Sequence, residues 1–185
     1  MTTSVQLLQQ VIDLYEEWLP KSGTGEAHLR QLIDSLKDAE KPRPVKAFMP
    51  PVVERWLEHC CIQTCLPRHR PVVDTLLEFG RSMKWYVPSA EYAGADMARN
   101  YSFSRLIGPH LFGEDSAQFY SDRIAVGFTI QAPGVYYPPH WHPAVGFYGT
   151  LTGTGLWQIG DGAFTKIPPG KLIHHPSNVS HAMQT

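Results

Sequence analysis

The frequent Gly and Pro residues of the C-terminal half constrain the fold of this chain most, because they recur every few residues from about position 86 onward. Between them lie short runs in which apolar and polar side chains alternate, as in half-buried strands. In the clearest run, 123–131, one face carries Ile124, Val126, Phe128 and Ile130. Further strands are predicted in FYGTLTG, GLWQIG, AFTKI, KLIHH and NVSHAMQT, with turns at APG, GTG, GDG and PPG. This pattern of short strands separated by turns predicts a β-sandwich or barrel.

The first 85 residues have a different pattern, because their apolar residues recur at helical spacing. Two amphipathic helices are predicted from stripes at Leu8, Val11, Ile12, Tyr15 and Leu19, and at Leu29, Leu32, Ile33 and Leu36. After the breaker-rich KPRPVKAFMPP, two more are predicted, beginning near Pro51 and Pro71. We therefore predict an α+β protein with a helical segment over 1–85 and a β-barrel over 86–185.

Net charge and hydropathy limit the kinds of molecule that this chain is expected to bind. The net charge is −1, and the only basic cluster is the short KPRPVK, so the chain lacks the electrostatic footprint of a protein that binds nucleic acid or an anionic membrane. A small molecule is the expected partner. The first apolar residues are interrupted by Asp13, Glu16 and Glu17, unlike a signal peptide, and no apolar run reaches membrane-spanning length. We expect a cytosolic protein.

Three cysteines lie close together at Cys60, Cys61 and Cys65. An odd number within a helical pattern argues against disulfides, so reduced thiols are predicted. A zinc site that also uses His59 or His69 is the alternative, although no zinc-ligand spacing is matched.

Three histidines form the strongest candidate site: His140, His142 and His181. Residues two apart in a strand face the same way, so His140 and His142 can direct their imidazoles to one point while Trp141 turns outward. Imidazole suits Zn, Fe, Ni and Cu, and three ligands leave coordination positions open. The H-x-H pattern alone is weak, since a lone histidine is more often a structural residue. The three together predict a transition-metal site.

The spacing around these histidines resembles the two motifs of the cupin superfamily. The first motif is matched by Gly134, His140, His142 and Gly153, and the second by Gly170, Pro176, Asn178 and His181. The resemblance covers about 100 residues of the C-terminal half. It implies a small jelly-roll barrel that holds a metal inside its mouth.

A closer resemblance is to the bacterial cupin-type dimethylsulfoniopropionate (DMSP) lyases, in particular the DddQ-like group, which also place helices before the barrel. It is carried by VGFTIQAPGVYYPPHWHPA and HHPSNVSHAMQT. It implies that His142 and His181 bind a divalent Fe, Zn or Mn ion, with His140 as a further ligand here. It also implies that Tyr148 is the catalytic base and that Tyr137 and His140 lie in the substrate pocket.

The reaction implied by this resemblance is a β-elimination. A base removes the proton next to the carboxylate, and dimethyl sulfide departs to leave acrylate. Aromatic faces suit the sulfonium cation of such a substrate, so Trp141 and Trp157 join the substrate-binding candidates. For each aromatic residue, ordinary packing is the alternative.

The sequence departs from these lyases at the metal site. The family has a metal-binding glutamate four residues after the second motif histidine, where this chain has Gly146. The loss removes an oxygen ligand and a negative charge, which predicts weaker metal binding, although three histidines suffice for zinc in other proteins. Two alternatives stay open: a three-His iron oxygenase acting on a small thiol or acid, and a degenerate cupin that binds a small ligand without catalysis.

The sequence stops four residues after His181, whereas cupin barrels continue through at least one more strand. Either the barrel is cut short, or it has an open edge that a partner covers. A second copy of the chain could be the partner that covers this edge, and in that case we expect a homodimer.

Overall fold

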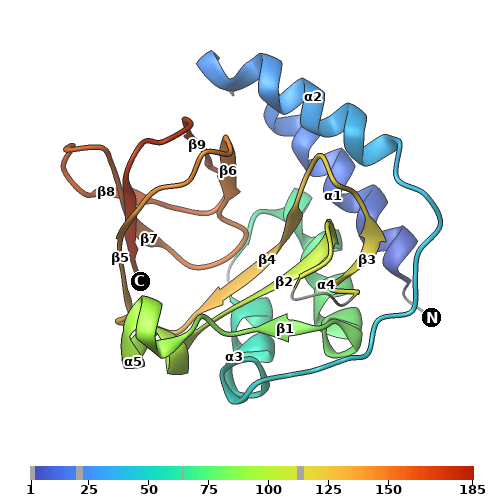
Figure 1. Ribbon diagram of the computed structural model, residues 1–185, viewed down its shortest axis with the longest axis horizontal. Helices are drawn as coiled ribbons and strands as arrows, with labels where there is room; N and C mark the ends of the chain where they lie inside the picture. The colour runs from blue at the N-terminus through green and yellow to red at the C-terminus, as the bar shows by residue number, and fades with distance from the viewer. Residues whose placement is uncertain (1–2, 20–22, 64, 112–114) are drawn as a thin grey trace.

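In the computed structural model, residues 3–19, 23–63, 65–111 and 115–185 are described, and they form an α+β fold (Figure 1). The α-helices are α1 (Ser4–Trp18), α2 (Glu26–Lys37), α3 (Pro51–Ile62), α4 (Arg70–Phe79) and α5 (Ala90–Asn100). The short 3₁₀ turns are η2 (Gly23–Gly25), η3 (Pro67–His69) and η4 (Gly80–Ser82). The strands are β1 (Trp85–Tyr86), β2 (Tyr101–Gly108), β3 (Ala117–Tyr120), β4 (Val126–Gln131), β5 (Tyr136–His140), β6 (Gly146–Gly149), β7 (Gly155–Ile159), β8 (Thr165–Ile167), β9 (Leu172–His175) and β10 (His181–Gln184).

The four helices predicted from the first 85 residues are confirmed. Helix α1 begins after Thr3, whose hydroxyl accepts a hydrogen bond from the Gln6 amide at 3.2 Å, so one of the unpaired first-turn donors is satisfied. Pro51 lies in the first turn of α3 and Pro71 in that of α4, where the missing N–H of proline costs little.

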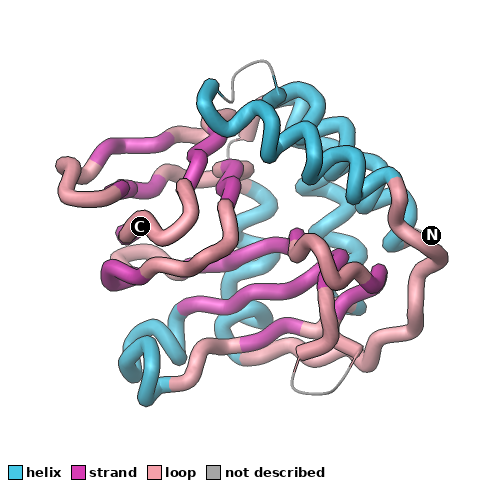
Figure 2. The backbone as a smooth tube through the Cα atoms, turned by 45° about the horizontal axis from the view of Figure 1, so that its top comes forward, coloured by secondary structure: helices cyan, strands magenta, loops and turns pink. Residues whose placement is uncertain are grey.

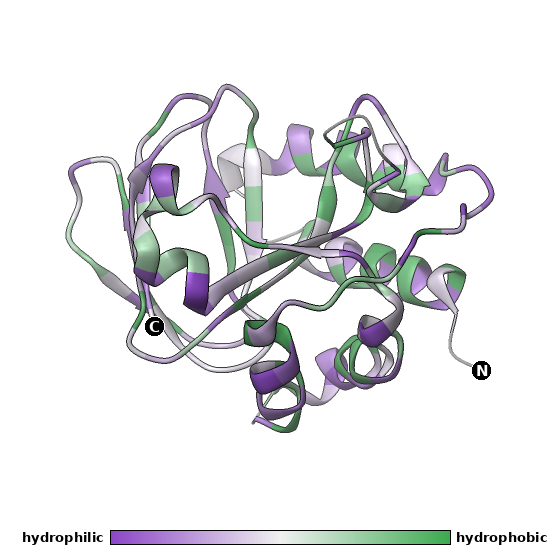
Figure 3. Ribbon diagram, turned by 60° about the horizontal axis from the view of Figure 1, so that its bottom comes forward, coloured by the Kyte–Doolittle hydropathy of each residue, from purple (hydrophilic) through white to green (hydrophobic). Residues whose placement is uncertain are grey.

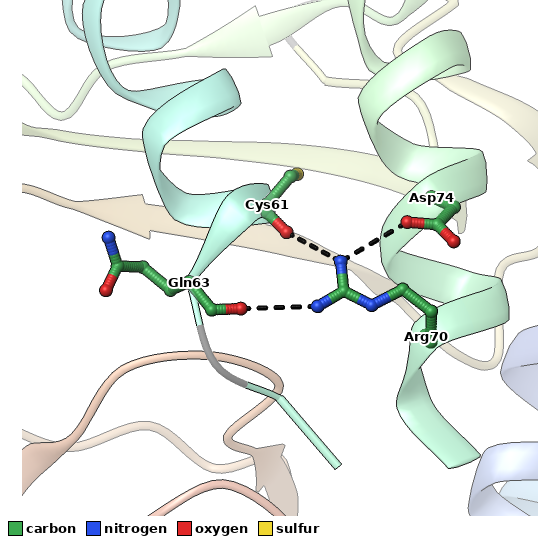
Figure 4. Close-up of polar contacts among 4 residues, drawn as sticks. All are labelled: Cys61, Gln63, Arg70 and Asp74. Carbon is green, nitrogen blue, oxygen red and sulfur yellow. Dashed lines mark hydrogen bonds and ion pairs between the residues drawn. The ribbon is translucent and has the colours of Figure 1, made fainter. Parts of the chain in front are cut away.

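Arg70 joins the end of α3 to the start of α4 (Figure 4). Its guanidinium donates to the carbonyl oxygens of Cys61 at 3.0 Å and Gln63 at 3.3 Å, and it pairs with the Asp74 carboxylate at 3.3 Å. A positive charge at the C-terminal end of a helix also interacts favourably with the helix dipole. This arrangement fixes the angle between the two helices.

The helices pack on a mixed sheet in which β2 pairs antiparallel with β1 and β4 and parallel with β3. The main hydrophobic core lies between these layers and includes Leu29, Trp85 and Leu106, all of which are fully buried. Figure 3 shows hydrophobic and hydrophilic residues on different sides of the helices. The predicted inward face of 123–131 is confirmed, since Val126, Phe128 and Ile130 belong to this core.

The region after residue 85, predicted to be rich in strands, begins with a helix instead. The Ser89 hydroxyl accepts a hydrogen bond from the Glu91 amide and starts α5, and Gly94, at φ +83°, interrupts it. The small residues of this segment carry too weak a periodic signal to predict the helix from sequence.

The remaining strands form two small sheets beside the first (Figures 1 and 2). One has the order β5-β10-β7-β8, and the other pairs β6 with β9. His181 of β10 lies between its cross-strand partners His140 of β5 and Ile159 of β7, and Gly146 of β6 lies opposite His175 of β9. The predicted α+β class, with helices before a half that is rich in strands, is confirmed.

The N-terminal helical region packs against the strands of the second half. A Cβ atom added at Gly149 would overlap the Trp18 ring, so only glycine lets α1 approach β6 this closely. Gly25 likewise lies against Phe147 of β6 and His174 of β9. The predicted segments 1–85 and 86–185 are therefore in contact, and their division at residue 85 remains a proposal.

Cys60, Cys61 and Cys65 are all free thiols, as predicted. Burial, with the neighbouring Cys60 next in effect, raises the pKa of Cys61 to about 12, which keeps it protonated. The described residues contain no group of three His, Cys, Asp or Glu side chains arranged as ready metal ligands, and the alternative zinc site near His59 or His69 stays a prediction. None of the described helices combines the length and apolar character needed to cross a membrane.

Candidate active site

The three predicted histidines meet between the two small sheets. His140 ends β5, His181 begins β10 as its direct cross-strand partner, and His142 follows in the loop after β5. The sequence interpretation placed His140 and His142 on one strand. The strand in fact stops at His140 and resumes at Gly146, so the loop, rather than strand parity, positions His142.

The spacing of the imidazole rings suits shared metal coordination. Ring centroids are 4.2 Å apart for His140 and His181, 5.1 Å for His142 and His181, and 6.4 Å for His140 and His142. A Zn–N bond of about 2.0–2.1 Å puts two tetrahedrally placed imidazole centroids about 5 Å apart. The observed spacings bracket this value. Rotation about side-chain bonds is still needed, because the ring nitrogens do not yet converge on one point.

Hydrogen bonds fix the tautomer of each of these rings. The Nδ1 atoms of His140, His142 and His181 lie 3.0, 2.7 and 3.1 Å from the carbonyl oxygens of Pro138, Ala144 and Val179. A carbonyl only accepts, so each Nδ1 carries the proton and each Nε2 keeps a free lone pair. Metal-binding histidines are commonly oriented in this way. The donor set therefore fits a transition metal.

Burial favours the uncharged form of His140 and His181. His181 is 3 % exposed, and burial lowers its pKa to about 4. Burial also lowers the pKa of His140. Nε2 of His181 has no hydrogen-bond partner among the described residues. A neutral, desolvated imidazole nitrogen without a partner is costly for folding alone and is the state that a metal ion requires.

A small pocket with a volume of about 10 Å³ adjoins these rings. It is lined by Tyr137, His140, Tyr148, Trp157, His181, Ala182 and Met183. Four of the predicted substrate and catalytic residues, Tyr137, His140, Tyr148 and Trp157, thus share one pocket. Trp141 does not line it, because its side chain turns outward and is 63 % exposed. The geometry gives no support to the predicted contact between Trp141 and substrate.

Tyr148 lies at the centre of this aromatic wall. Its ring centroid is 5.2 Å from that of Trp157 and 5.1 Å from that of His175. Burial raises its pKa above the ordinary value. Tyr148 in turn helps to raise the pKa of Tyr15 to about 12, after burial as the larger cause. The protein alone therefore holds Tyr148 as a neutral phenol, so its use as a base requires a nearby positive charge.

Sequence reasoning missed His175. It is 1 % exposed, its ring stacks on His181 with centroids 4.0 Å apart, and neither ring nitrogen has a hydrogen-bond partner in the described part of the chain. Burial, followed by the neighbouring histidines, lowers its pKa to about 3. The available signal was the alternation in KLIHH, which places Ile173 and His175 on one face and His174 on the other.

Comparisons with known proteins agree with the cupin-lyase geometry. The sequence profile of the DMSP lyase family matches residues 24–185. DMSP lyase DddQ from Ruegeria pomeroyi DSS-3 is 26% identical over 153 residues, which cover 82% of this chain and 72% of the relative.

Solved structures of the same class share the fold. A structure described with the DMSP lyases RdDddP and RnDddQII has a TM-score of 0.77 at 22% identity and covers 98% of this chain and 85% of its own. DddQ from R. pomeroyi DSS-3 has a TM-score of 0.70 at 24% identity, with 94% and 85% covered. The family profile spans nearly the whole sequence, and this chain therefore belongs to the DMSP lyase family.

Proposed function

We propose that this chain is a metal-dependent carbon–sulfur lyase that cleaves DMSP to dimethyl sulfide and acrylate. Family membership supports the reaction. The observation that supports the metal dependence is the set of neighbouring histidines whose Nδ1 atoms face backbone carbonyls, which leaves each Nε2 atom with a free lone pair. His142 and His181 would hold a divalent Fe, Zn or Mn ion, with His140 beside them.

Such an ion, when bound, would polarise the substrate carboxylate and favour ionisation of a nearby phenol. The protein itself supplies the base and the pocket. Tyr148 would take the proton from the carbon next to the carboxylate through its phenolate oxygen. The electrons of that C–H bond form the double bond of acrylate, and the C–S pair leaves with the sulfur. No redox change is involved.

The sulfonium end of the substrate would lie against Tyr137 and Trp157. A sulfonium cation has no hydrogen-bond donor, so aromatic faces are its natural contacts. Tyr101 is buried and packs edge-on against Tyr137, with centroids 5.1 Å apart, and so holds that ring in place. Aromatic walls also exclude water from the proton-transfer step.

Incubating DMSP with the metal-loaded chain and following products by NMR tests this function. The expected result is equal release of dimethyl sulfide and acrylate without oxygen consumption. Oxygen uptake with Fe²⁺ and a small thiol, without dimethyl sulfide release, would favour the alternative oxygenase suggested by Gly146. Tight binding of DMSP without turnover would favour the degenerate, non-catalytic cupin. Cytosolic location and pairing of two copies remain parts of this proposal.

A further inference from the structure

We infer that His175 takes the place of the missing acidic ligand and is a direct ligand of the proposed metal centre. The inference rests on the metal centre proposed above and does not depend on the substrate. It starts from Gly146, the position where the resembling lyases carry their glutamate. In this fold Gly146 of β6 and His175 of β9 are cross-strand partners.

Gly146 faces the centre of the site. A Cβ atom added there would lie 3.4 Å from Cε1 of His142 and 3.6 Å from Cβ of His175. Both separations are ordinary van der Waals contacts. A longer side chain at 146 would therefore extend into the space between His142 and His175. With glycine present, no side chain from position 146 enters this space.

His175 has the properties of a ligand rather than of a packing residue. It touches His181 at 4.0 Å between centroids and interacts electrostatically with His140 and His142. Its two ring nitrogens are buried and lack partners among the described residues. A buried polar atom without a hydrogen bond destabilises the fold, so an imidazole with a purely structural role would be unfavourable here. A metal ion would use one of these lone pairs.

The neighbouring His174 provides a matched control. It lies on the same strand but on the opposite face, where its ring stacks on Phe147 with centroids 5.1 Å apart, next to His28. Removing either imidazole deletes the same atoms from adjacent positions of β9. Only His175 faces the proposed metal ligands, so only its loss should change metal binding.

The test measures Co²⁺ binding to the full chain by equilibrium dialysis and by the visible absorption of bound Co²⁺, without any activity assay. His175→Ala is expected to weaken Co²⁺ binding by at least about 10-fold and to alter the absorption band, while His174→Ala leaves both unchanged. Adding Gly146→Glu to His175→Ala should restore the affinity, because the carboxylate enters the vacated space. Circular dichroism of each variant checks that it is folded.

Three results would overturn the inference: Co²⁺ affinity in His175→Ala equal to that in His174→Ala, a loss that Gly146→Glu does not restore, or no Co²⁺ binding by the native chain. The first two would leave the proposed lyase activity untouched, since release of dimethyl sulfide is measured separately. Conversely, His175-dependent Co²⁺ binding in a chain that does not cleave DMSP would contradict the proposed function and leave the ligand assignment standing.

Discussion

The core under the β2 sheet and the space between the two small sheets differ in the polar atoms that they bury. Polar atoms of the first region without a partner among the described residues, such as Ser104 Oγ, are isolated among large apolar side chains, whereas the second region gathers several imidazole nitrogens together. In the first region, large side chains such as Leu106 and Trp85 are fully buried, and the Trp85 indole donates to the Gly80 carbonyl at 2.8 Å. In the second, a small cluster of Trp157, Ile173 and Met183 surrounds imidazole nitrogens without partners in the described residues. The first region contributes to the stability of the fold. In the second region, the unpaired imidazole nitrogens cost stability and are available to the proposed metal ion.

Tyr148→Phe should produce the largest effect and confirm that the second region serves chemistry. Removing the phenolic oxygen removes the proposed base, so kcat for dimethyl sulfide release should fall by about 10²–10⁴-fold. The ring and its contacts with Trp157 remain, so the thermal midpoint and metal content should stay close to native. A variant that keeps most of its kcat would remove Tyr148 from the mechanism.

Leu106→Ala tests whether the first region contributes to stability and not to chemistry. Leu106 is 0 % exposed within the main core, so truncation should lower the free energy of unfolding by about 2–5 kcal/mol, measured by urea denaturation. The metal site is built from other elements, so kcat of the folded fraction should not change. A specific loss of kcat would show that the two regions are not separable in this way.

Arg70→Ala should have a smaller effect, confined to the helical layer. It removes hydrogen bonds to the Cys61 and Gln63 carbonyls, while the partly exposed pair with Asp74 adds little. We expect a loss of about 1–2 kcal/mol in the free energy of unfolding, with Arg70→Lys intermediate. Equal stability of Arg70→Lys and native protein would mean that charge alone matters there.

His175→Leu should give the smallest change, and it should increase stability, whereas Leu106→Ala decreases it. Leucine fills a similar volume and leaves no buried nitrogen without a partner. The metal-free protein should therefore be more stable than native by about 1 kcal/mol, measured by denaturation in the presence of a chelator. His174→Leu, on the other face of β9, should show a smaller gain, because only Nε2 of His174 is buried without a partner among the described residues, whereas both ring nitrogens of His175 are. A destabilised His175→Leu would indicate that the imidazole has a packing role.

Much of the fold follows from the sequence because its signals are local. The helical stripes, the alternation of 123–131, and the prolines at helix starts, Pro51 and Pro71, each depend on a few neighbouring residues. Helix α5 was not predicted, because Gly94 and its small neighbours weaken the helical period. The two small sheets pair strands far apart in sequence, such as β5 with β10, and no local pattern specifies that pairing.

The sequence predicted those site residues that belong to the recognised motifs. His140, His142, His181 and Tyr148 were found by spacing and resemblance, and they lie together as expected. Trp141 was assigned from sequence proximity, which does not report side-chain direction, and it points to solvent. His175 was missed because its significance depends on the pairing of β9 with β6, which brings it opposite Gly146. That contact follows only from the three-dimensional arrangement.

The central claim is that histidines between the two small sheets hold a metal that the lyase reaction requires. It is tested most directly by adding Fe²⁺, Mn²⁺ or Zn²⁺ in steps to the metal-free chain and measuring the rate of dimethyl sulfide release from DMSP after each step. The account predicts no release without metal and a rate that rises to a plateau at one ion per chain for at least one of the three. Undiminished release from the metal-free chain, or none with any of these ions, would contradict it.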